Sequence, residues 1–287
     1  MADIRIAGVM RSGIYSPNHV GNDAAIITDV AKQLRKRGCS VTLYSETQFQ
    51  ETDIKEDVIL SMAREEASIL KLQRLEKLGK LVINSGNGIS NSVREVMARL
   101  LMNADIPYPD SIIVDTNENI VKELEKLGIN NCWVKRGESY SLHKEDVTYC
   151  RHRAEAQDML HEYFYRGIRR AVINRHLEGD LVKFYGVRGR NYFYWFYPYY
   201  GYRERYGLDW VDDDRDREKS KFDVEALINY CERACEEMEI EIYGGDCIVD
   251  NEGNFQIIDF NDWPSFSPCC KEAARAIAGY VLNRIKN

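Results

Sequence analysis

The sequence predicts a mixed fold, in which a parallel α/β layer comes first and α+β lobes follow. Between residues 4 and 84, short apolar runs alternate with charged amphipathic segments, the pattern of a parallel sheet whose strands are connected by helices. Near the other end, two apolar strands within residues 243–266 are separated only by the turn Asn251-Glu252-Gly253-Asn254, a composition that favours a tight reversal. Parallel and antiparallel strands are therefore expected in different parts of one chain.

The composition is that of an ordinary soluble globular protein, with 44% hydrophobic and 30% charged residues among 287. At this length the chain can bury a sizeable core in two or three lobes. Its net charge of −7 argues against a general nucleic-acid or membrane-surface binder, because such proteins need a basic field. Apolar runs stay short of the ~18 residues of a membrane span. The N-terminus lacks a signal-peptide pattern, and the eight cysteines show no CxxC pair and no zinc-ligand spacing. These features predict a cytoplasmic protein with reduced thiols.

The first 90 residues predict four strands and two long helices. The strands are expected at 4–9, 41–44, 58–62 and 81–84, and the helices at 23–37 and 64–78. Loops beyond the carboxyl ends of parallel strands commonly bind ligands, so the loop after the first strand is a candidate substrate loop. A plain surface connection fits it equally well. The polar residues of this loop are Arg11, Ser12, Tyr15, Asn18 and His19.

In the middle of the chain, Lys135 stands where an apolar strand at 131–137 meets a glycine-containing loop. A cation at such a position is suited to holding phosphate oxygens, and the alternative is an exposed charge at a strand end. A helix is expected to start near Ser92, through the capping box Ser92-x-x-Glu95. The other elements predicted here are a strand at 111–114 and helices at 121–127 and 154–165.

Aromatic residues dominate the segment 192–202, which two interpretations fit. It is either a lid or stacking wall over a substrate or, more in keeping with its alternation, a core strand with an aromatic face. The charge run 209–219 follows it and is expected to be solvated. The remaining predicted elements are strands at 171–177 and 181–187 and helices at 224–238 and 270–285.

Two carboxylates occupy strand positions where apolar residues would be expected, Asp246 on the first strand of the 243–266 hairpin and Asp259 on the second. Asn261 lies two residues after Asp259, so both side chains point to the same face of the strand. Carboxylate and amide oxygens are ligands that Mg²⁺ prefers. The alternative is a polar-edged hairpin with solvated acids, but Asp259 lies within the apolar run QIIDFN, where an unpaired charge would be costly to bury. We therefore predict a magnesium site on this hairpin.

The order of these parts resembles the ATP-grasp superfamily over nearly the whole chain. The resemblance rests on an ordered set of residues: Lys135, the segment 174–177, Lys183, Asp246, Asp259-x-Asn261 and Pro264. Members of this superfamily have an N-terminal α/β domain and two α+β lobes that close on ATP. The resemblance implies such an N-terminal domain at 1–90, a central lobe at 91–172 and a C-terminal lobe with the metal site at 173–287. It also implies ATP and Mg²⁺, with two ions expected and Mn²⁺ as a substitute.

The resemblance assigns the nucleotide to one set of residues. Lys135 would contact the ATP phosphates, and residues 174–177 would form the hinge whose side chain and backbone groups read the adenine edge. Asp180 would contact the ribose hydroxyls, and Glu178 is the alternative residue for this role. The implied nucleotide-binding residues are Lys135, Asn174 (through its side chain), Arg175, Leu177 and Asp180.

A second set would carry the chemistry. Lys183 matches a basic residue that reaches the transferred phosphate, and Arg94 stands where many members have a phosphate-contacting lysine. His143 lies where the inositol phosphate kinases of the superfamily have a histidine near the phosphates. Phosphoryl transfer depends mainly on positioning and on neutralising the phosphate oxygens. The residues that match the magnesium triad are Asp246, Asp259 and Asn261.

Two enzyme classes of the superfamily fit the chain. A carboxylate–amine ligase, resembling ribosomal-protein glutamate ligases and D-alanine ligases, would phosphorylate an acid and let an amine displace the acyl phosphate. We favour it because most members of the superfamily phosphorylate a carboxylate. The runner-up is a small-molecule kinase resembling the inositol trisphosphate 5/6-kinases, which Asp259 and His143 favour. So do basic residues around the expected site, Arg166, Arg169, Arg170, Arg188 and Arg190.

A third class, a module that binds ATP without catalysis, conflicts with the complete triad. The expected substrate is a small-molecule acid or a phosphorylated polyol. Neither nucleic acid nor a membrane is expected as a partner, and a homodimer is left open.

Overall fold

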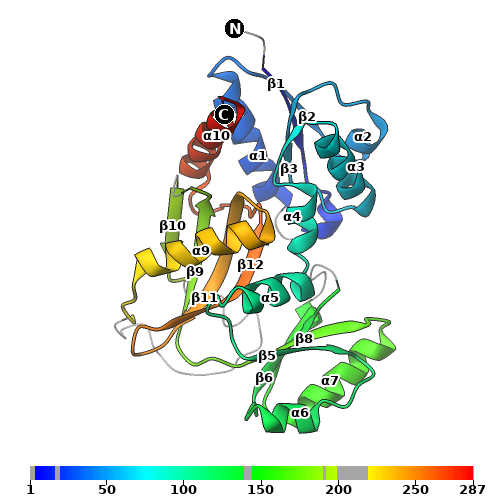
Figure 1. Ribbon diagram of the computed structural model, residues 1–287, viewed down its shortest axis with the longest axis vertical. Helices are drawn as coiled ribbons and strands as arrows, with labels where there is room; N and C mark the ends of the chain where they lie inside the picture. The colour runs from blue at the N-terminus through cyan, green and yellow to red at the C-terminus, as the bar shows by residue number, and fades with distance from the viewer. Residues whose placement is uncertain (1–3, 17–19, 139–143, 190–191, 199–218, 287) are drawn as a thin grey trace.

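Three four-stranded sheets follow one another along the long axis of the molecule, as Figure 1 shows for the computed structural model. The structure describes residues 4–16, 20–138, 144–189, 192–198 and 219–286. Seen in Figure 1, the N-terminal sheet lies at the top, the sheet that contains the β11–β12 hairpin in the middle, and the central part of the chain at the bottom. The predicted combination of a parallel sheet with antiparallel sheets is confirmed.

The N-terminal sheet has the order β2-β1-β3-β4, and all its strands are parallel. Its strands are β1 (Arg5–Val9), β2 (Ser40–Tyr44), β3 (Val58–Ser61) and β4 (Leu81–Ile83). Ile6 belongs to one buried cluster and its neighbour Ala7 to another, because helices cover both faces of the sheet. Those helices include α1 (Val20–Arg35), α2 (Glu46–Glu51) and α3 (Glu66–Lys77), and the short 3-10 turn Gly13–Tyr15 follows β1.

The central part of the chain begins with two helices, α4 (Gly86–Asn91) and α5 (Arg94–Asn103). An antiparallel sheet of order β5-β8-β6-β7 follows, formed by β5 (Ser111–Asp115), β6 (Cys132–Arg136), β7 (Val147–Cys150) and β8 (Arg170–Arg175). One face of this sheet packs against α6 (Val121–Lys126) and α7 (Arg153–Tyr165), through residues such as Val134 and Ile173. The other face contacts the third sheet, because Val172 packs in the core that includes Phe260.

The third sheet has the order β10-β9-β11-β12 and is antiparallel throughout. Its strands are β9 (Asp180–Val187), β10 (Tyr192–Phe196), β11 (Ile242–Val249) and β12 (Phe255–Asp262), and α9 (Val224–Met238) packs on it. The pairing of β11 with β12 shifts by one residue between Asp246 and Cys247. This sheet contains the predicted hairpin at its β11–β12 edge.

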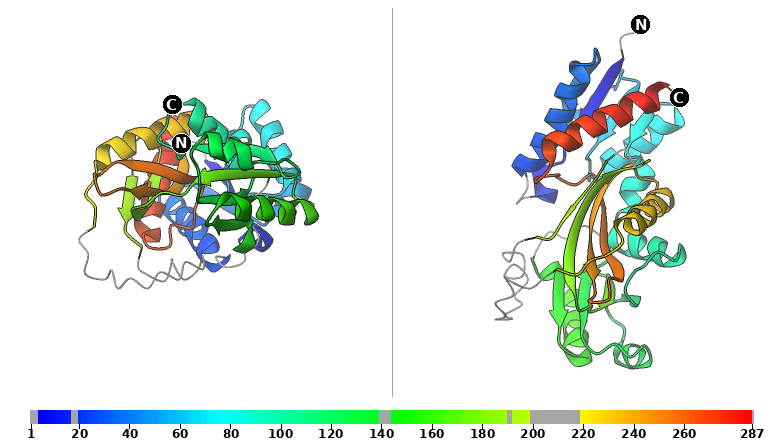
Figure 2. Two further views of the ribbon diagram at one scale, coloured as in Figure 1. Left: turned by 90° about the horizontal axis from the view of Figure 1, so that it is seen from below. Right: turned by 90° about the vertical axis from the view of Figure 1, so that its left-hand side faces the viewer.

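The last helix, α10 (Cys270–Lys286), returns to the N-terminal sheet. It lies beside α1 in two views (Figures 1 and 2). Its apolar face, including Ala274, Ile277 and Val281, belongs to the same buried cluster as Ile26 and Val30 of α1. The N-terminal layer is therefore built from both ends of the chain.

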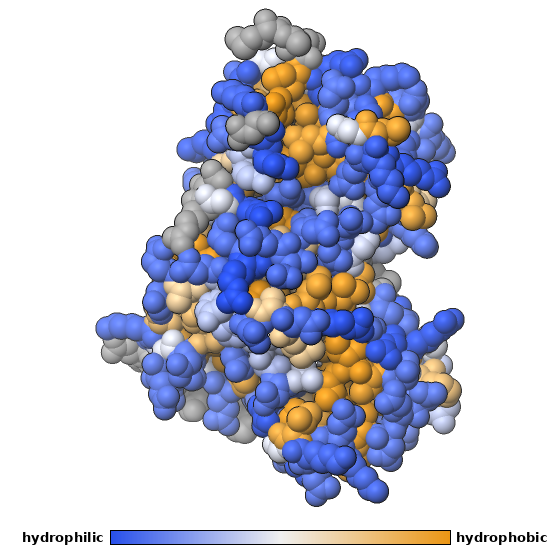
Figure 3. Space-filling model, viewed as in Figure 1, coloured by the Kyte–Doolittle hydropathy of each residue, from blue (hydrophilic) through white to orange (hydrophobic). Residues whose placement is uncertain are grey.

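One local prediction is wrong and another is confirmed in part. Ser92 does not begin a capping box: α5 starts at Arg94 without a side-chain cap, and Ser92 instead ends α4, where its hydroxyl donates to the carbonyl of Gly88. The strand expected within 192–202 is present at Tyr192–Phe196, and residues 199–218 lie outside the described ranges. Among the described residues no helix is both long and apolar enough to span a membrane. In Figure 3, hydrophilic side chains cover most of the visible face.

Candidate active site

Three neighbouring strands place Lys183, Asp246 and Asp259 side by side. Lys183 on β9 pairs in register with Asp246 on β11, which pairs with Asp259 on β12. Residues opposite one another in antiparallel strands share a face, so all three side chains project from the same side of the sheet. The Lys183 ammonium contacts an Asp246 carboxylate oxygen at 2.6 Å, and the Asn261 amide donates to Asp259 at 2.9 Å. The predicted triad therefore forms one polar group with Lys183.

Lys135 reaches this group from the opposing sheet. Its ammonium donates to the carbonyl oxygen of Ile258 on β12 at 3.2 Å, so it bridges the central and third sheets. Burial, together with a smaller contribution from the nearby Arg94 guanidinium, lowers the pKa of Lys135 to about 8, while Asp259 and Asp246 act in the opposite direction. Arg94, the first residue of α5, donates to the carbonyl of Arg136 at 3.0 Å, which holds it beside the strand that carries Lys135.

Asn174 belongs to the same interface through Tyr108. The Asn174 amide donates to the Tyr108 hydroxyl at 3.1 Å and to the Ser111 hydroxyl at 2.6 Å. The Asn174 side-chain oxygen is buried and has no hydrogen-bond partner among the described residues. Burial raises the pKa of Tyr108 to about 12, with opposing contributions from Arg94 and Asp259. We call this set the inter-sheet cluster: Arg94, Tyr108, Lys135, Asn174, Lys183, Asp246, Asp259 and Asn261.

Three aromatic rings extend the cluster along the central sheet. The Trp133 indole donates to the ring nitrogen of His176 at 3.1 Å, and Tyr149 lies 5.3 Å from Trp133 and 4.9 Å from His176, measured between ring centroids. Burial lowers the pKa of His176, which favours its neutral form. We call Trp133, Tyr149 and His176 the aromatic wall. It was not predicted from the sequence, although the alternation of side chains along the strands could have indicated it. Trp133 lies two residues before Lys135, and His176 lies two residues after Asn174.

Two predicted nucleotide residues have other partners. The Arg175 guanidinium forms an ion pair with Asp110 at 2.9 Å and donates to the carbonyl of Leu127, so its side chain fastens the end of β8 to a neighbouring turn. The Asp180 carboxylate is buried, accepts from the backbone of Ser220 at 2.9 Å and pairs with Lys219 at 3.2 Å. Leu177 is half-buried in the connection from β8 to β9.

The arginines that favoured a phosphorylated substrate are largely engaged elsewhere. Arg166 pairs with the buried Asp146 at 2.7 Å, and Arg188 pairs with Glu236 at 3.2 Å. Arg170 pairs with both Glu95 and Asp115. Arg169 is exposed, and the structure gives only its backbone a partner, Glu138, within the part of the chain it describes. Arg190 and His143 lie outside the described residues.

The candidate substrate loop is more tightly held than a surface connection. The Arg11 guanidinium is largely buried and pairs with Asp23 at 3.1 Å. The Ser12 amide donates to the buried carboxylate of Glu46 at 2.8 Å. Burial and the negative charges of Glu65 and Glu46 raise the pKa of Tyr15. Asn18 and His19 lie outside the described residues.

The inter-sheet cluster fits the groups that the sequence predicts there. Two carboxylates and an amide on one face form an oxygen-donor set of the kind that Mg²⁺ accepts. Within the described ranges no group of three His, Cys, Asp or Glu side chains could hold a metal. The buried, unpaired oxygen of Asn174 offers an acceptor to an amino group such as that of adenine.

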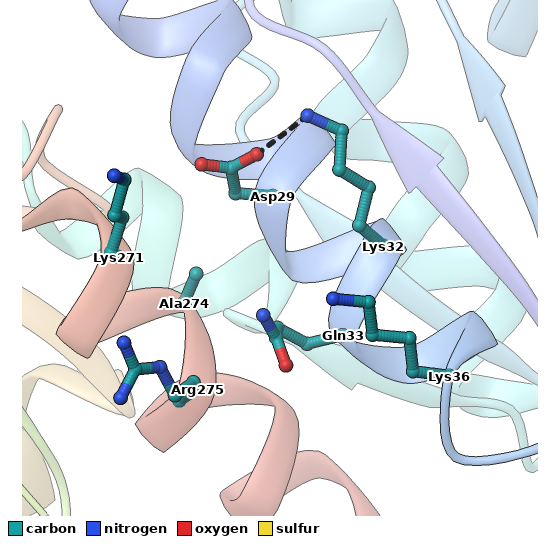
Figure 4. Close-up of a pocket in the computed structure, with 7 residues that line it drawn as sticks. All are labelled: Asp29, Lys32, Gln33, Lys36, Lys271, Ala274 and Arg275. Atoms are coloured by element: carbon teal, nitrogen blue, oxygen red, sulfur yellow. Dashed lines mark hydrogen bonds and ion pairs between the residues drawn. The ribbon is translucent and has the colours of Figure 1, made fainter.

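A separate hollow of about 200 Å³ lies between α1 and α10 (Figure 4). Lys32, Lys36, Lys271 and Arg275 line it together with Asp29, Gln33 and Ala274. Lys32 pairs with Asp29 at 2.8 Å. None of these residues belongs to the inter-sheet cluster, so the hollow and the candidate active site are different features.

The arrangement of the three sheets matches that of solved structures with the ATP-grasp fold. Among solved structures, the chain is similar to D-alanyl-alanine synthetase A from Vibrio cholerae O1 biovar eltor str. N16961, with a TM-score of 0.71, 11% identity and full coverage of both chains. It is also similar to the ATP complex of D-alanine–D-alanine ligase from Bacillus anthracis, with a TM-score of 0.70, 13% identity, and coverage of 99% of this chain and 100% of that one.

A third similar structure is a RimK domain ATP-grasp protein from Sphaerobacter thermophilus DSM 20745, with a TM-score of 0.66, 16% identity, and coverage of 97% and 99%. No family model matches the sequence, and no curated protein matches it. At these identities the likeness establishes the fold of the chain and no more.

Proposed function

We propose that this protein is an ATP- and Mg²⁺-dependent ligase that joins a carboxylic acid to an amine through an acyl phosphate and forms ADP. The observation that carries the proposal is the meeting of three cations with two carboxylates between two antiparallel sheets. The residues are Lys135 and Arg94 on one side and Lys183, Asp246 and Asp259 on the other. The D-alanine ligases among the similar solved structures support the same class.

In this proposal, the cations of the cluster hold the phosphates of ATP. Lys135 and Arg94 neutralise phosphate oxygens from the central sheet, and Lys183 approaches the transferred group from β9. Mg²⁺, expected as two ions held by Asp246, Asp259 and Asn261, would supply further neutralisation of the phosphate oxygens. Preorganised charges of this kind stabilise the transition state of phosphoryl transfer most where water is excluded.

The adenine would lie against the aromatic wall of the central sheet. Trp133, Tyr149 and His176 offer ring faces for stacking, and the Asn174 oxygen offers an acceptor for the adenine amino group. We assign the reading of the adenine edge to Asn174 and the nearby backbone, with Arg175 and Leu177 contributing only through main-chain groups. For the ribose, the exposed Glu178 is better placed than Asp180, whose carboxylate already has two partners.

The chemistry then needs no base for its first step. A carboxylate substrate is ionised at neutral pH, so one of its oxygens can attack the γ-phosphorus directly while the bond to ADP breaks. The amine next attacks the acyl carbon, phosphate leaves, and the amine loses its proton to solvent. An alcohol acceptor would instead need a group to take its proton.

A small-molecule kinase is the second candidate, because Asp259 stands where most ligases of the superfamily have glutamate. Its support is weaker than the sequence suggested. Three of the arginines expected to bind a phosphorylated substrate form ion pairs with acids of the chain, namely Arg166, Arg170 and Arg188.

The proposal is tested by measuring ADP and phosphate in parallel across a panel of acids and amines. A ligase forms both products only when an acid and an amine are present, and hydroxylamine traps its acyl phosphate as a hydroxamate. A kinase forms ADP and a stable phosphorylated product without free phosphate. We expect Asp259→Asn to lower the rate by about 100-fold or more, the order seen when a charge-stabilising group is lost. Unchanged Mg²⁺-dependent turnover in that variant would remove the metal assignment.

A further inference from the structure

Three side chains at one edge of the N-terminal sheet donate hydrogen bonds to backbone carbonyls at one end of the β11–β12 hairpin. Each follows the carboxyl end of a different strand: Arg11 after β1, Arg64 after β3 and Asn84 after β4. All three side chains are largely or fully buried. In open α/β sheets this edge is ordinarily where ligands bind, but here it is used to hold another part of the same chain.

Arg64 holds the last residue of β12 from the side opposite the metal ligands. Its guanidinium contacts the Asp262 carboxylate at 2.6 Å and donates to the Asp262 carbonyl at 3.2 Å. The Asp262 side chain is fully buried. Because side chains alternate along a strand, Asp262 points away from the face that presents Asp259 and Asn261. The contact therefore fixes the strand without occupying the inter-sheet cluster.

Arg11 and Asn84 hold the residues on either side of this point. Arg11 donates to the carbonyl of Trp263 at 2.9 Å, and the Trp263 backbone is left-handed with φ 35°. The Asn84 amide donates to the carbonyl of Ile242, at the start of β11, at 2.7 Å. The Asn84 side-chain oxygen accepts from the backbone amides of Glu241 and Ile242, both at 2.8 Å. Both strands of the hairpin are thus tied to the N-terminal sheet.

We propose that Arg11, Arg64 and Asn84 are positioning residues for the metal site: they fix the direction in which Asp259 and Asn261 present their oxygens. This inference rests on the proposed function, because it takes those two residues as Mg²⁺ ligands. Mg²⁺ requires near-octahedral geometry at close range, so a small slide or rotation of the end of β12 weakens its binding. The proposed nucleotide contacts of Lys135 and Asn174 come from another sheet, and Lys135 contacts β12 at Ile258, away from the anchored end of the strand.

The test compares Arg64→Lys and Arg11→Lys with Arg166→Lys, in the full-length chain. Each variant keeps a positive charge beside the acidic partner but loses the planar guanidinium, which can donate hydrogen bonds to two acceptors at once. Arg166 is a matched control, because it also pairs with a buried carboxylate, that of Asp146. Three quantities are measured: the melting temperature, the affinity for an ATP analogue in EDTA, and the affinity for Mn²⁺ with the analogue bound, by electron paramagnetic resonance.

We expect the two anchor variants to bind Mn²⁺ about 10-fold more weakly, in line with residues that orient metal ligands. Their metal-free affinity for the analogue stays within about twofold of the unmodified chain, and Arg166→Lys binds Mn²⁺ normally. If Arg64→Lys does not fold, Arg11→Lys decides, because it keeps its ion pair with Asp23.

Two results overturn the inference, and they differ in what they say of the proposed function. Unchanged Mn²⁺ affinity in the folded anchor variants, together with its loss in Asp259→Asn, removes the positioning role and leaves the proposed function standing. An unmodified chain that binds the nucleotide analogue but no Mn²⁺ removes both.

Discussion

Burial determines the pKa of Lys135 more than the charges of its neighbours do. Lys135 is almost completely buried, and the loss of hydration outweighs the attraction of Asp259 and Asp246, so its pKa falls. A lysine in this state is strongly attracted to an incoming phosphate, because few water molecules have to be displaced from it. The same burial makes its charge sensitive to pH in an accessible range.

The affinity of the free protein for ATP is expected to fall as pH rises through 8. The pKa of Lys135 is lowered from 10.5 to about 8, so its ammonium is charged below that pH and neutral above it. The measurement is a titration of ATP binding between pH 6.5 and 9.5. Lys135→Arg is the control, because a guanidinium stays charged throughout this range and its profile should be flat. Equal pH dependence in both proteins would contradict the role of Lys135.

Asn174 is expected to discriminate between ATP and inosine triphosphate. Its buried oxygen can accept a hydrogen bond from the adenine amino group but meets a carbonyl oxygen in hypoxanthine. A lost hydrogen bond that leaves a buried group unpaired costs about 1–3 kcal/mol, which is about 5-fold to more than 100-fold in affinity. Competition binding with the two nucleotides measures the ratio. Asn174→Ala should bring the ratio close to one, and an unchanged ratio in that variant would assign recognition to the backbone.

At the scale of the element, the β11–β12 hairpin could be predicted well from sequence alone. The tight turn, the alternation and the acids in apolar runs are all local signals, and the structure confirms that Asp259 and Asn261 share a face. Ser92 was mispredicted because its local signal, a serine three residues before Glu95, competes with a preceding helix. Glu95 forms ion pairs with Arg170 and Arg99 instead, and a partner on another strand cannot be read from local spacing.

Gly245→Ala on β11 is expected to disturb the hairpin, and Gly279→Ala on α10 is expected to stabilise the protein. A Cβ at residue 245 would overlap the Asp259 carbonyl oxygen and lie 2.6 Å from the Phe184 ring, so β12 would have to shift at a cost of about 1–3 kcal/mol. At residue 279 the nearest atom outside the helix is 3.8 Å away, so alanine gains about 0.5–1 kcal/mol of helix stability. Urea denaturation measures both changes. Equal stability of the two variants would contradict the packing described for β11.

At the scale of the whole molecule, the sequence predicted the order of the parts but not how distant parts meet. The sheets formed by residues 5–83, 111–175 and 180–262 follow the expected succession. The pairing of Arg64 with Asp262 joins residues 198 positions apart, and nothing in either local sequence announces it. The aromatic wall likewise joins Trp133 to His176 across 43 positions. Such contacts depend on the tertiary arrangement, and local sequence patterns do not specify them.

Nucleotide is expected to stabilise the whole molecule, because it would bridge the central and third sheets. At a concentration 100 times its Kd, a ligand adds about 2.7 kcal/mol to the free energy of unfolding. For a chain of 287 residues that corresponds to a rise in Tm of about 4–5 °C. Differential scanning calorimetry with Mg²⁺ and a non-hydrolysable ATP analogue measures the rise. Asp259→Asn should lose part of it, and a rise of the same size in that variant would contradict a metal-bridged nucleotide.

The packing of α10 on α1 has a consequence for biosynthesis. A ribosome makes the N-terminal sheet first, yet the buried cluster in which α1 packs on this sheet is completed only when residues 270–286 have been made. Until then the part of this cluster that α10 covers stays open, and the growing chain exposes it to chaperones and to other nascent chains. The first layer to be synthesised is therefore among the last to be completed, and the antiparallel sheets between residues 111 and 262 can fold while it waits.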